Sequence, residues 1–273
     1  MSGSRTGAVG SDRSFQRLLR DVERDLGFRT SSYNDAYLRR RVEARMRRRG
    51  VESYDAYGRV LDEEADEREA LLDALSVNVT SFFRNPEVWE QVREVLRELD
   101  DGIRIWSAAC SDGREAYSMA MLATLDPAID ERRVEIVGTD IDREILRRAR
   151  AGEYRRSGTD DPVDQLSPVD GAEEFVTLSE TAVTVDDPIR EMVTFRRHDL
   201  TDGDPAGEFD LVVCRNLFIY IEDHAKARMV STLRSGLRPD GYLVVGLTET
   251  LPPDCRDAFE PVDRRRRVYR LRG

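Results

Sequence analysis

From residue 103 onward, short apolar segments alternate with helical ones, and this alternation is the feature that most limits the fold. The expected strands lie at 103–109, 134–138, 209–214, 242–247 and 267–271, and the expected helices at 115–125, 142–151 and 224–237, with a turn at 238–241. Strands that alternate with helices in this way predict a parallel sheet covered on both faces.

The residues before this region have helical spacing instead. Apolar side chains recur at intervals of three and four between Phe15 and Glu98, and the expected helices are 15–26, 34–49, 53–61, 66–75 and 86–99. The polar residues at the beginning of the chain show no such pattern. We therefore expect a disordered start over 1–12, a helical domain over 13–80 and an α/β domain over 81–273.

Residues 153–197 interrupt the alternation. Apolar segments of strand length occur at 175–178, 182–185 and 193–195, without a long helix between them. This spacing predicts a small antiparallel insert within the α/β domain.

The composition is strongly acidic and almost free of lysine. The chain has 54 acidic and 43 basic residues, a formal net charge of -11, and Lys226 as its only lysine. This balance is typical of salt-adapted cytosolic proteins, although a GC-rich genome also favours arginine over lysine. The charge argues against non-specific binding of nucleic acid. Because the sequence shows neither a signal peptide nor a long apolar run, we expect a cytoplasmic protein without direct membrane insertion.

Cysteine and histidine are too sparse to indicate a metal or disulfide framework. Three cysteines have no CxxC spacing, and His198 and His224 are the only histidines. We expect reduced thiols and no metal site.

Polar residues follow two of the expected strands. The segment from Trp106 to Gly113 has one glycine and lacks the dinucleotide fingerprint, which disfavours a nicotinamide or flavin enzyme. Asp140 follows the next strand, where an acidic residue commonly binds a ribose diol. Alternatively, Asp140 or Asp142 caps the next helix, and Asp142 is the better candidate for that cap.

Glu115 lies in the first turn of an expected helix. It either interacts with the helix dipole or contacts a cationic cofactor. Arg215 and Tyr220 follow the strand at 209–214. Either both are polar groups at the mouth of a pocket, or Arg215 forms a salt bridge and Tyr220 is a buried, hydrogen-bonded phenol. The arginine-rich helix at 34–49 is either a solvated face or a docking surface for an acidic partner.

Four segments together indicate a known family. They are the heptapeptide Asn78–Arg84, the Trp-Ser-Ala-Ala segment at 106–109, Thr139-Asp140-Ile141-Asp142, and Cys214-Arg215-Asn216 with Ile219-Tyr220. From about residue 14 to 271 the chain resembles the chemotaxis receptor methyltransferases, the CheR-type protein-glutamate O-methyltransferases. The resemblance implies a helical receptor-docking domain followed by a Rossmann-like class I S-adenosylmethionine-dependent methyltransferase domain with a small antiparallel β insert.

The resemblance also implies the cofactor, the partner and the site. The cofactor would be S-adenosylmethionine, with S-adenosylhomocysteine as product, and the partners would be the cytoplasmic methylation helices of the receptors. The implied cofactor contacts are Asn78, Thr80, Arg84, Glu115, Asp140, Asp199, Leu200, Arg215 and Asn216. Arg84 and Tyr220 would organise the acceptor. The implied receptor-docking residues are Arg39, Arg40, Arg45 and Arg48, and we expect a monomer.

The chain departs from the family pattern in three places. Gly113-Arg114-Glu115-Ala116-Tyr117 stands where relatives often have Gly-Glu-Glu-Pro-Tyr, Asp199 replaces an asparagine, and Gly246-Leu247-Thr248-Glu249 replaces Gly-His-Ser-Glu.

The alternatives are a methyltransferase for a small carboxylic acid, a cofactor-binding module without turnover and, more remotely, a nicotinamide oxidoreductase.

Overall fold

The computed structural model describes residues 5–75, 80–99, 102–156 and 161–273. The chain divides into two compact units. The first, called the helical unit here, comprises Met1–Val77 and Tyr220–His224; the second, called the sheet unit, comprises Asn78–Ile219 and Ala225–Gly273.

The helical unit contains the helices that the apolar spacing predicts. They are α1 (Arg5–Leu26), α2 (Asp35–Arg49), α3 (Tyr54–Glu63) and α4 (Ala65–Leu75), and the short η1 (Thr30–Ser32), which was not expected, lies between α1 and α2. The Asn34 side chain caps α2 by accepting from Tyr37 N, and Gly50 ends it with φ 65°. Ser53 caps α3. These local signals explain why the boundaries of α2 and α3 could be predicted closely.

The disordered start expected over residues 1–12 is wrong for the described part of that segment. Helix α1 begins at Arg5, and Asp12 forms an ion pair of 2.7 Å with Arg39. Residues 5–12 contain only Ala8 and Val9 as apolar residues, which is too few to show a helical period.

A short segment from late in the sequence completes the helical unit. Asn34 N donates to Tyr220 O at 2.9 Å, and Glu222 N donates to Ser32 O at 2.9 Å. Between these bonds, Tyr33 and Ile221 form an antiparallel bridge. The ring of Tyr220 lies 4.7 Å from that of Tyr37. Residues 220–224 are therefore held by the helical unit.

The sheet unit is built on a seven-stranded sheet of order β6-β2-β1-β7-β8-β10-β9. The strands are β1 (Ile103–Ala108), β2 (Val134–Asp140), β6 (Val193–Arg197), β7 (Phe209–Cys214), β8 (Leu237–Val245), β9 (Phe259–Asp263) and β10 (Val268–Leu271). Strands β6, β2, β1, β7 and β8 pair in parallel, whereas β10 is antiparallel to both β8 and β9.

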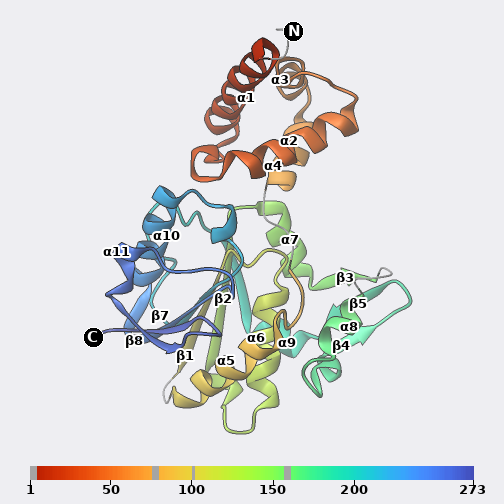
Figure 1. Cartoon of the computed structure of the whole chain (residues 1–273). Helices are drawn as coiled ribbons and strands as arrows, with labels where there is room; N and C mark the ends of the chain where they lie inside the picture. The colour runs from red at the N-terminus through yellow and green to blue at the C-terminus, as the bar shows by residue number, and fades with distance from the viewer. Residues whose placement is uncertain (1–4, 76–79, 100–101, 157–160) are drawn as a thin grey trace. The chain divides into compact units, whose positions relative to one another are not determined.

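Helices cover both faces of this sheet, as the alternation predicts (Figure 1). Helices α5 (Pro86–Glu98), α6 (Arg114–Leu125) and α7 (Arg143–Ala151) share one apolar core with alternate residues of the central strands, such as Ile105 and Leu211. Helix α10 (Asp223–Ser235) lies on the opposite side. Further short helical segments are η2 (Glu131–Arg133), α8 (Pro162–Leu166), η4 (Ala172–Phe175), α9 (Asp187–Glu191), η5 (Phe218–Tyr220) and α11 (Pro253–Arg256).

The antiparallel insert is present but smaller than expected. It is a three-stranded sheet of order β3-β5-β4, formed by β3 (Glu153–Arg155), β5 (Ala182–Val185) and β4 (Val176–Leu178). The assignment of 193–195 to the insert is wrong, because β6 pairs in parallel with β2 in the main sheet. A short apolar run does not show which sheet will accept it.

The turn expected at 238–241 is also wrong as a boundary, because β8 already begins at Leu237. The register between β7 and β8 shifts between Phe209 and Leu211, and Asp240 has φ 62°. Pro239 and Gly241 therefore mark an irregularity inside a strand.

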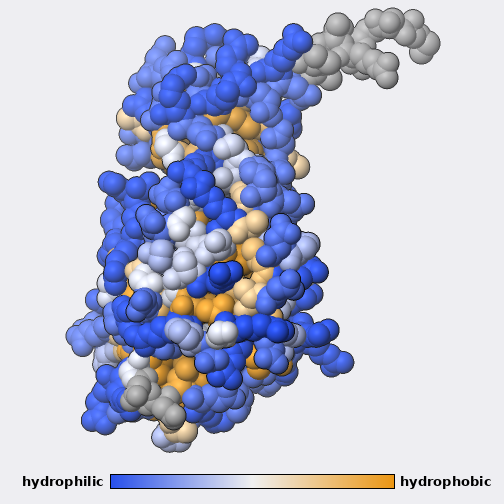
Figure 2. Space-filling model, turned by 90° about the vertical axis from the view of Figure 1, so that its left-hand side faces the viewer, coloured by the Kyte–Doolittle hydropathy of each residue, from blue (hydrophilic) through white to orange (hydrophobic). Residues whose placement is uncertain are grey.

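Charged residues make up 36% of the chain, and hydrophilic residues cover most of the face shown in Figure 2. In the described residues, no helix is long and apolar enough to cross a membrane.

Candidate functional site

The candidate site lies in the sheet unit, where the carboxyl ends of β2, β1, β7 and β8 follow one another in the sheet. Ligands of open α/β sheets bind outside these strand ends. Asp140 is the last residue of β2, and the loops that leave β1, β7 and β8 carry Ser111, Asn216 and Glu249.

The loop after β1 has an unusual backbone. Ala109 and Ser111 have φ values of 57° and 53°, which is uncommon outside glycine and often occurs at functional sites. Gly113 has φ 88°, and a Cβ there would lie 2.8 Å from the Phe195 ring. The buried Ser111 Oγ has no hydrogen-bond partner among the described residues. The loop thus brings backbone and a hydroxyl to the strand ends.

Asp140 and Asp142 have separate roles. Asp142 caps α7 by accepting from Glu144 N and Ile145 N. Asp140 accepts instead from Ser111 N at 3.0 Å and Asp142 N at 3.1 Å. Burial outweighs these bonds and raises the pKa of Asp140 to about 6. Asp142 is therefore the cap, and Asp140 is a buried carboxyl suited to hydroxyl donors.

Glu115 points from α6 toward the end of β1. It accepts from Ser107 Oγ at 2.9 Å, and its other oxygen lies 3.4 Å from Arg215 Nη1. Burial raises the pKa of Glu115 in spite of Arg215. An added cationic group would favour the ionised form.

Arg215 connects the end of β7 with the segment before α5. Its Nη2 donates to Arg84 O at 2.8 Å and to Asn85 Oδ1 at 2.9 Å, and its guanidinium lies 5.5 Å from the centre of the Trp89 ring. Its Nε has no partner among the described residues. Arg215 thus holds the Arg84 backbone beside Glu115.

Glu249 is a buried residue of this region that sequence reasoning missed as a site residue. Its Oε2 accepts from Gly246 N at 2.6 Å and from Asn216 N at 2.9 Å. Burial raises the pKa of Glu249. The one available signal was its place in the Gly246–Glu249 segment, directly after the strand at 242–247.

The remaining predicted cofactor residues are partly brought together. Arg84 and Thr80 are half-buried in the segment before α5, while Asn78 lies outside the described residues. Asp199 accepts from Thr201 N at 2.8 Å, and Leu200 is buried. Their segment reaches the end of β2, because His198 N donates to Asp140 O at 3.0 Å.

The other predicted residues belong to the helical unit. Tyr220 packs on Tyr37 there. Arg45 donates two hydrogen bonds to the buried Glu67, at 2.9 and 2.5 Å, and Arg39 lies over the Phe15 ring. Arg40 and Arg48 are exposed. The Arg40 guanidinium lies 5.8 Å from the centre of the Tyr37 ring, so three of the four predicted docking arginines, Arg39, Arg40 and Arg45, have contacts inside the unit.

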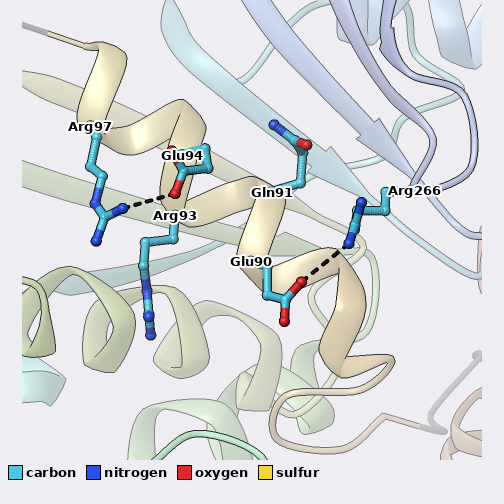
Figure 3. A pocket seen from close by; sticks show the side chains of 6 residues that line it. All are labelled: Glu90, Gln91, Arg93, Glu94, Arg97 and Arg266. Atoms are coloured by element: carbon cyan, nitrogen blue, oxygen red, sulfur yellow. Dashed lines mark hydrogen bonds and ion pairs between the residues drawn. The ribbon is translucent and has the colours of Figure 1, made fainter.

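A pocket of about 360 Å³ lies elsewhere in the sheet unit, along α5 (Figure 3). Four of its charged residues form two ion pairs: Glu90 with Arg266 at 3.1 Å and Glu94 with Arg97 at 2.8 Å. None of the strand-end residues lines it, so it is not the candidate site. Among the described residues, no cluster of histidine, cysteine and carboxylate side chains could hold a metal ion.

Known proteins match the chain over nearly its full length. The family model for the CheR methyltransferase, SAM binding domain, matches residues 78–268, and that for the CheR methyltransferase, all-alpha domain, matches residues 13–76. A chemotaxis protein methyltransferase of Listeria monocytogenes is 31% identical over 245 residues, which are 88% of this chain and 91% of that protein.

Two proteins of Pseudomonas aeruginosa are also similar. Chemotaxis protein methyltransferase 1 is 32% identical over 84% of this chain and 87% of its own length. A probable biofilm formation methyltransferase is 34% identical over 86% of this chain and 56% of its own length. The two family matches and these relatives confirm the expected fold class and cofactor: the chain belongs to the CheR family of S-adenosylmethionine-dependent methyltransferases.

Proposed function

We propose that this enzyme transfers a methyl group from S-adenosylmethionine to glutamate side chains of chemotaxis receptors, in the cytoplasm, and so forms glutamyl methyl esters for sensory adaptation. The observation that carries the proposal is the match to curated chemotaxis methyltransferases across both domains, 88% of this chain for the Listeria protein. An enzyme for a small carboxylic acid would not need the all-alpha domain.

The strand-end residues fit the cofactor. The Asp140 carboxylate suits the two ribose hydroxyls, because its present partners are backbone amides. Glu115 suits the cationic amino-acid portion. Ser111 Oγ and Arg215 Nε offer two further polar groups. The proposed set is completed by Asn78, Thr80, Arg84, Asp199, Leu200 and Asn216.

The reaction makes modest chemical demands on the protein. Bound S-adenosylmethionine supplies an electrophilic methyl group. The acceptor glutamate has an ordinary pKa of about 4.3 and is already ionised at neutral pH, so the enzyme needs no general base. Alignment and exclusion of water can then supply roughly 7–11 kcal/mol of the rate enhancement. In this proposal, Arg84 and Tyr220 orient the acceptor carboxylate.

The partner would be the acidic methylation helices of the receptors. Arg40 and Arg48 suit this role best, because both are exposed on α2. Arg39 and Arg45 are engaged with Asp12 and Glu67, so we give them a supporting role. The proposal includes a monomeric enzyme that binds neither nucleic acid nor membrane and is adapted to high salt.

The test uses methyl-labelled S-adenosylmethionine and cytoplasmic receptor fragments from the same organism at high salt. Label that base releases as volatile methanol establishes a glutamyl methyl ester. Measurable cofactor binding without such label would overturn the receptor assignment. Tyr220→Phe should lower turnover more than cofactor affinity, and equal losses in both would remove Tyr220 from the acceptor site.

A further inference from the structure

Glu249 lies at the centre of a tight arrangement between the ends of two neighbouring parallel strands. It is 3% exposed. One oxygen accepts from Asn216 N after β7 and from Gly246 N after β8, at 2.9 and 2.6 Å. The other is 3.4 Å from Ile219 N. A single carboxylate thus joins the two loops.

The loop that Glu249 holds has a conformation that the backbone alone disfavours. Asn216 has φ 62°, a left-handed value that asparagine tolerates better than most residues but that still costs free energy. The Asn216 amide donates to the fixed, buried Glu249 carboxylate, and this hydrogen bond opposes relaxation of the turn. The conformation at Asn216 therefore depends on Glu249.

The lack of a side chain at Gly246 is part of the same arrangement. A Cβ at this position would lie 2.5 Å from Glu249 Oε2, 2.9 Å from Asn216 N and 3.0 Å from Asn216 Nδ2. The space beside Gly246 is thus filled by the Glu249 carboxylate and by the Asn216 side chain. A side chain at position 246 would therefore displace Glu249, Asn216 or both.

We infer that Glu249 is a positioning residue for the cofactor site: its carboxylate fixes the turn at Asn216 and thereby the direction of the Asn216 side chain. This inference rests on the proposed function in one respect, the placement of Asn216 beside the cofactor. Glu249 itself contacts backbone amides and acts through Asn216.

Three charged or titratable groups lie near Glu249. They are Glu115 on α6, Cys214 at the end of β7 and Arg215 directly after β7. Glutamine at position 249 keeps the size of the side chain but provides only one acceptor oxygen. Its NH₂ group would face either the Asn216 and Gly246 amides or that of Ile219. Glu249→Gln therefore changes the hydrogen bonds while keeping the volume.

The test is a double-mutant cycle read by calorimetric titration of the full chain with S-adenosylhomocysteine. We expect Glu249→Gln to weaken binding about tenfold in the wild-type background and less than twofold in the Asn216→Ala background. Equal weakening in both backgrounds, or none in the wild type, overturns the inference. The exposed Glu260→Gln on β9 is the matched control and should leave affinity unchanged.

Gly246→Ala provides a second route if Glu249→Gln does not fold. Its added methyl group would displace the same two side chains, so its effect on affinity should also shrink in the Asn216→Ala background. An undiminished effect overturns the inference. Because the readout is product binding, a failure of receptor methylation would affect the proposed function and not this result.

Discussion

Two buried carboxylates, Glu67 in the helical unit and Asp140 in the sheet unit, are surrounded in opposite ways. Glu67 accepts from Arg45 at 2.9 and 2.5 Å and from Tyr57 at 2.6 Å. Burial alone would raise the pKa of Glu67, but these bonds outweigh it and lower the pKa. At Asp140, burial dominates over the backbone bonds, and the pKa rises to about 6.

The difference distinguishes a carboxylate that serves folding from one suited to a ligand. Glu67 finds a countercharge and a hydroxyl inside its own unit, so ionisation is compensated on folding. Ionisation of the buried Asp140 costs free energy, and further hydrogen-bond donors from a ligand would reduce that cost. A perturbed pKa in a strand-end loop is the expected signature of a binding site.

The largest expected effect tests the role of Glu67 and is a loss of stability. Glu67→Gln removes the charge opposite Arg45, and we expect the free energy of unfolding to fall by about 3 kcal/mol, because breaking a buried pair leaves the partner uncompensated. Denaturant titration measures it, with the exposed Glu63→Gln as control. Affinity for S-adenosylhomocysteine should not change. If affinity fell while stability stayed unchanged, the assignment of Glu67 as a carboxylate that serves folding would be wrong.

The next effect concerns cofactor affinity. Asp140→Ala should weaken binding of S-adenosylhomocysteine about 100-fold, since each of two hydrogen bonds to a charged acceptor contributes about 1.5 kcal/mol. Asp142→Ala is the matched control, because it removes the α7 cap and should cost about 1 kcal/mol of stability with little change in affinity. Comparable losses of affinity in both variants would contradict the assignment of Asp140.

A smaller effect is the pH dependence of binding. Hydroxyl donors favour the Asp140 carboxylate, so affinity should rise about tenfold from pH 5 to pH 7, through the unliganded pKa. Asp140→Asn should lose this component, and titration calorimetry at both pH values measures the difference. A pH profile that Asp140→Asn leaves unchanged would assign the titration to Glu115 or Glu249 instead.

The two carboxylates should also affect stability with opposite sign. For Asp140 the folded-state pKa is raised, so its contribution is fully present below its usual pKa and is lost as pH rises through about 6. For Glu67 the folded-state pKa is lowered, so its contribution is present above its usual pKa and is lost as pH falls through the lowered value. The stability of Asp140→Asn and Glu67→Gln against pH measures each component.

The smallest effect tests which arginines dock. Arg48→Glu should raise KM for receptor fragments about threefold at low salt, in the range of an exposed ion pair, and much less at molar salt, where the Debye length is about 3 Å. Arg132→Glu, at a position that is 83% exposed in the sheet unit, serves as the control. Methylation that is unaffected at low salt would argue against docking through Arg48.

Local signals made much of the fold predictable. Asn34, Gly50 and Ser53 mark helix ends through bonds within a few residues, so the sequence predicts them well. The partners of β6 and the irregularity of β8 depend on distant strands, which explains why both were misassigned. The strand β9 was not predicted for the same reason.

The candidate site was predictable to the same extent. Asp140 and Glu115 come at the end of or after strands that have strong apolar patterns. In the structure, Asp140 ends β2 and Glu115 accepts from Ser107 near the carboxyl end of β1. The role of Glu249 depends on its closeness to Asn216, 33 residues earlier in the chain. The sequence does not distinguish Arg45 from the exposed arginines beside it, because its partner Glu67 lies 22 residues later in the chain.

The small segment 220–224 has a consequence for the order in which the protein is made. Ribosomes release the helices of the first unit early, but Tyr220, Ile221 and Glu222, which bond to residues 32–34, emerge only after most of the sheet unit. The first unit therefore cannot acquire its full set of contacts during its own synthesis. The helical unit is complete only when residues 220–224 have been made, so a nascent chain cut short before residue 220 would lack the backbone partners of residues 32–34.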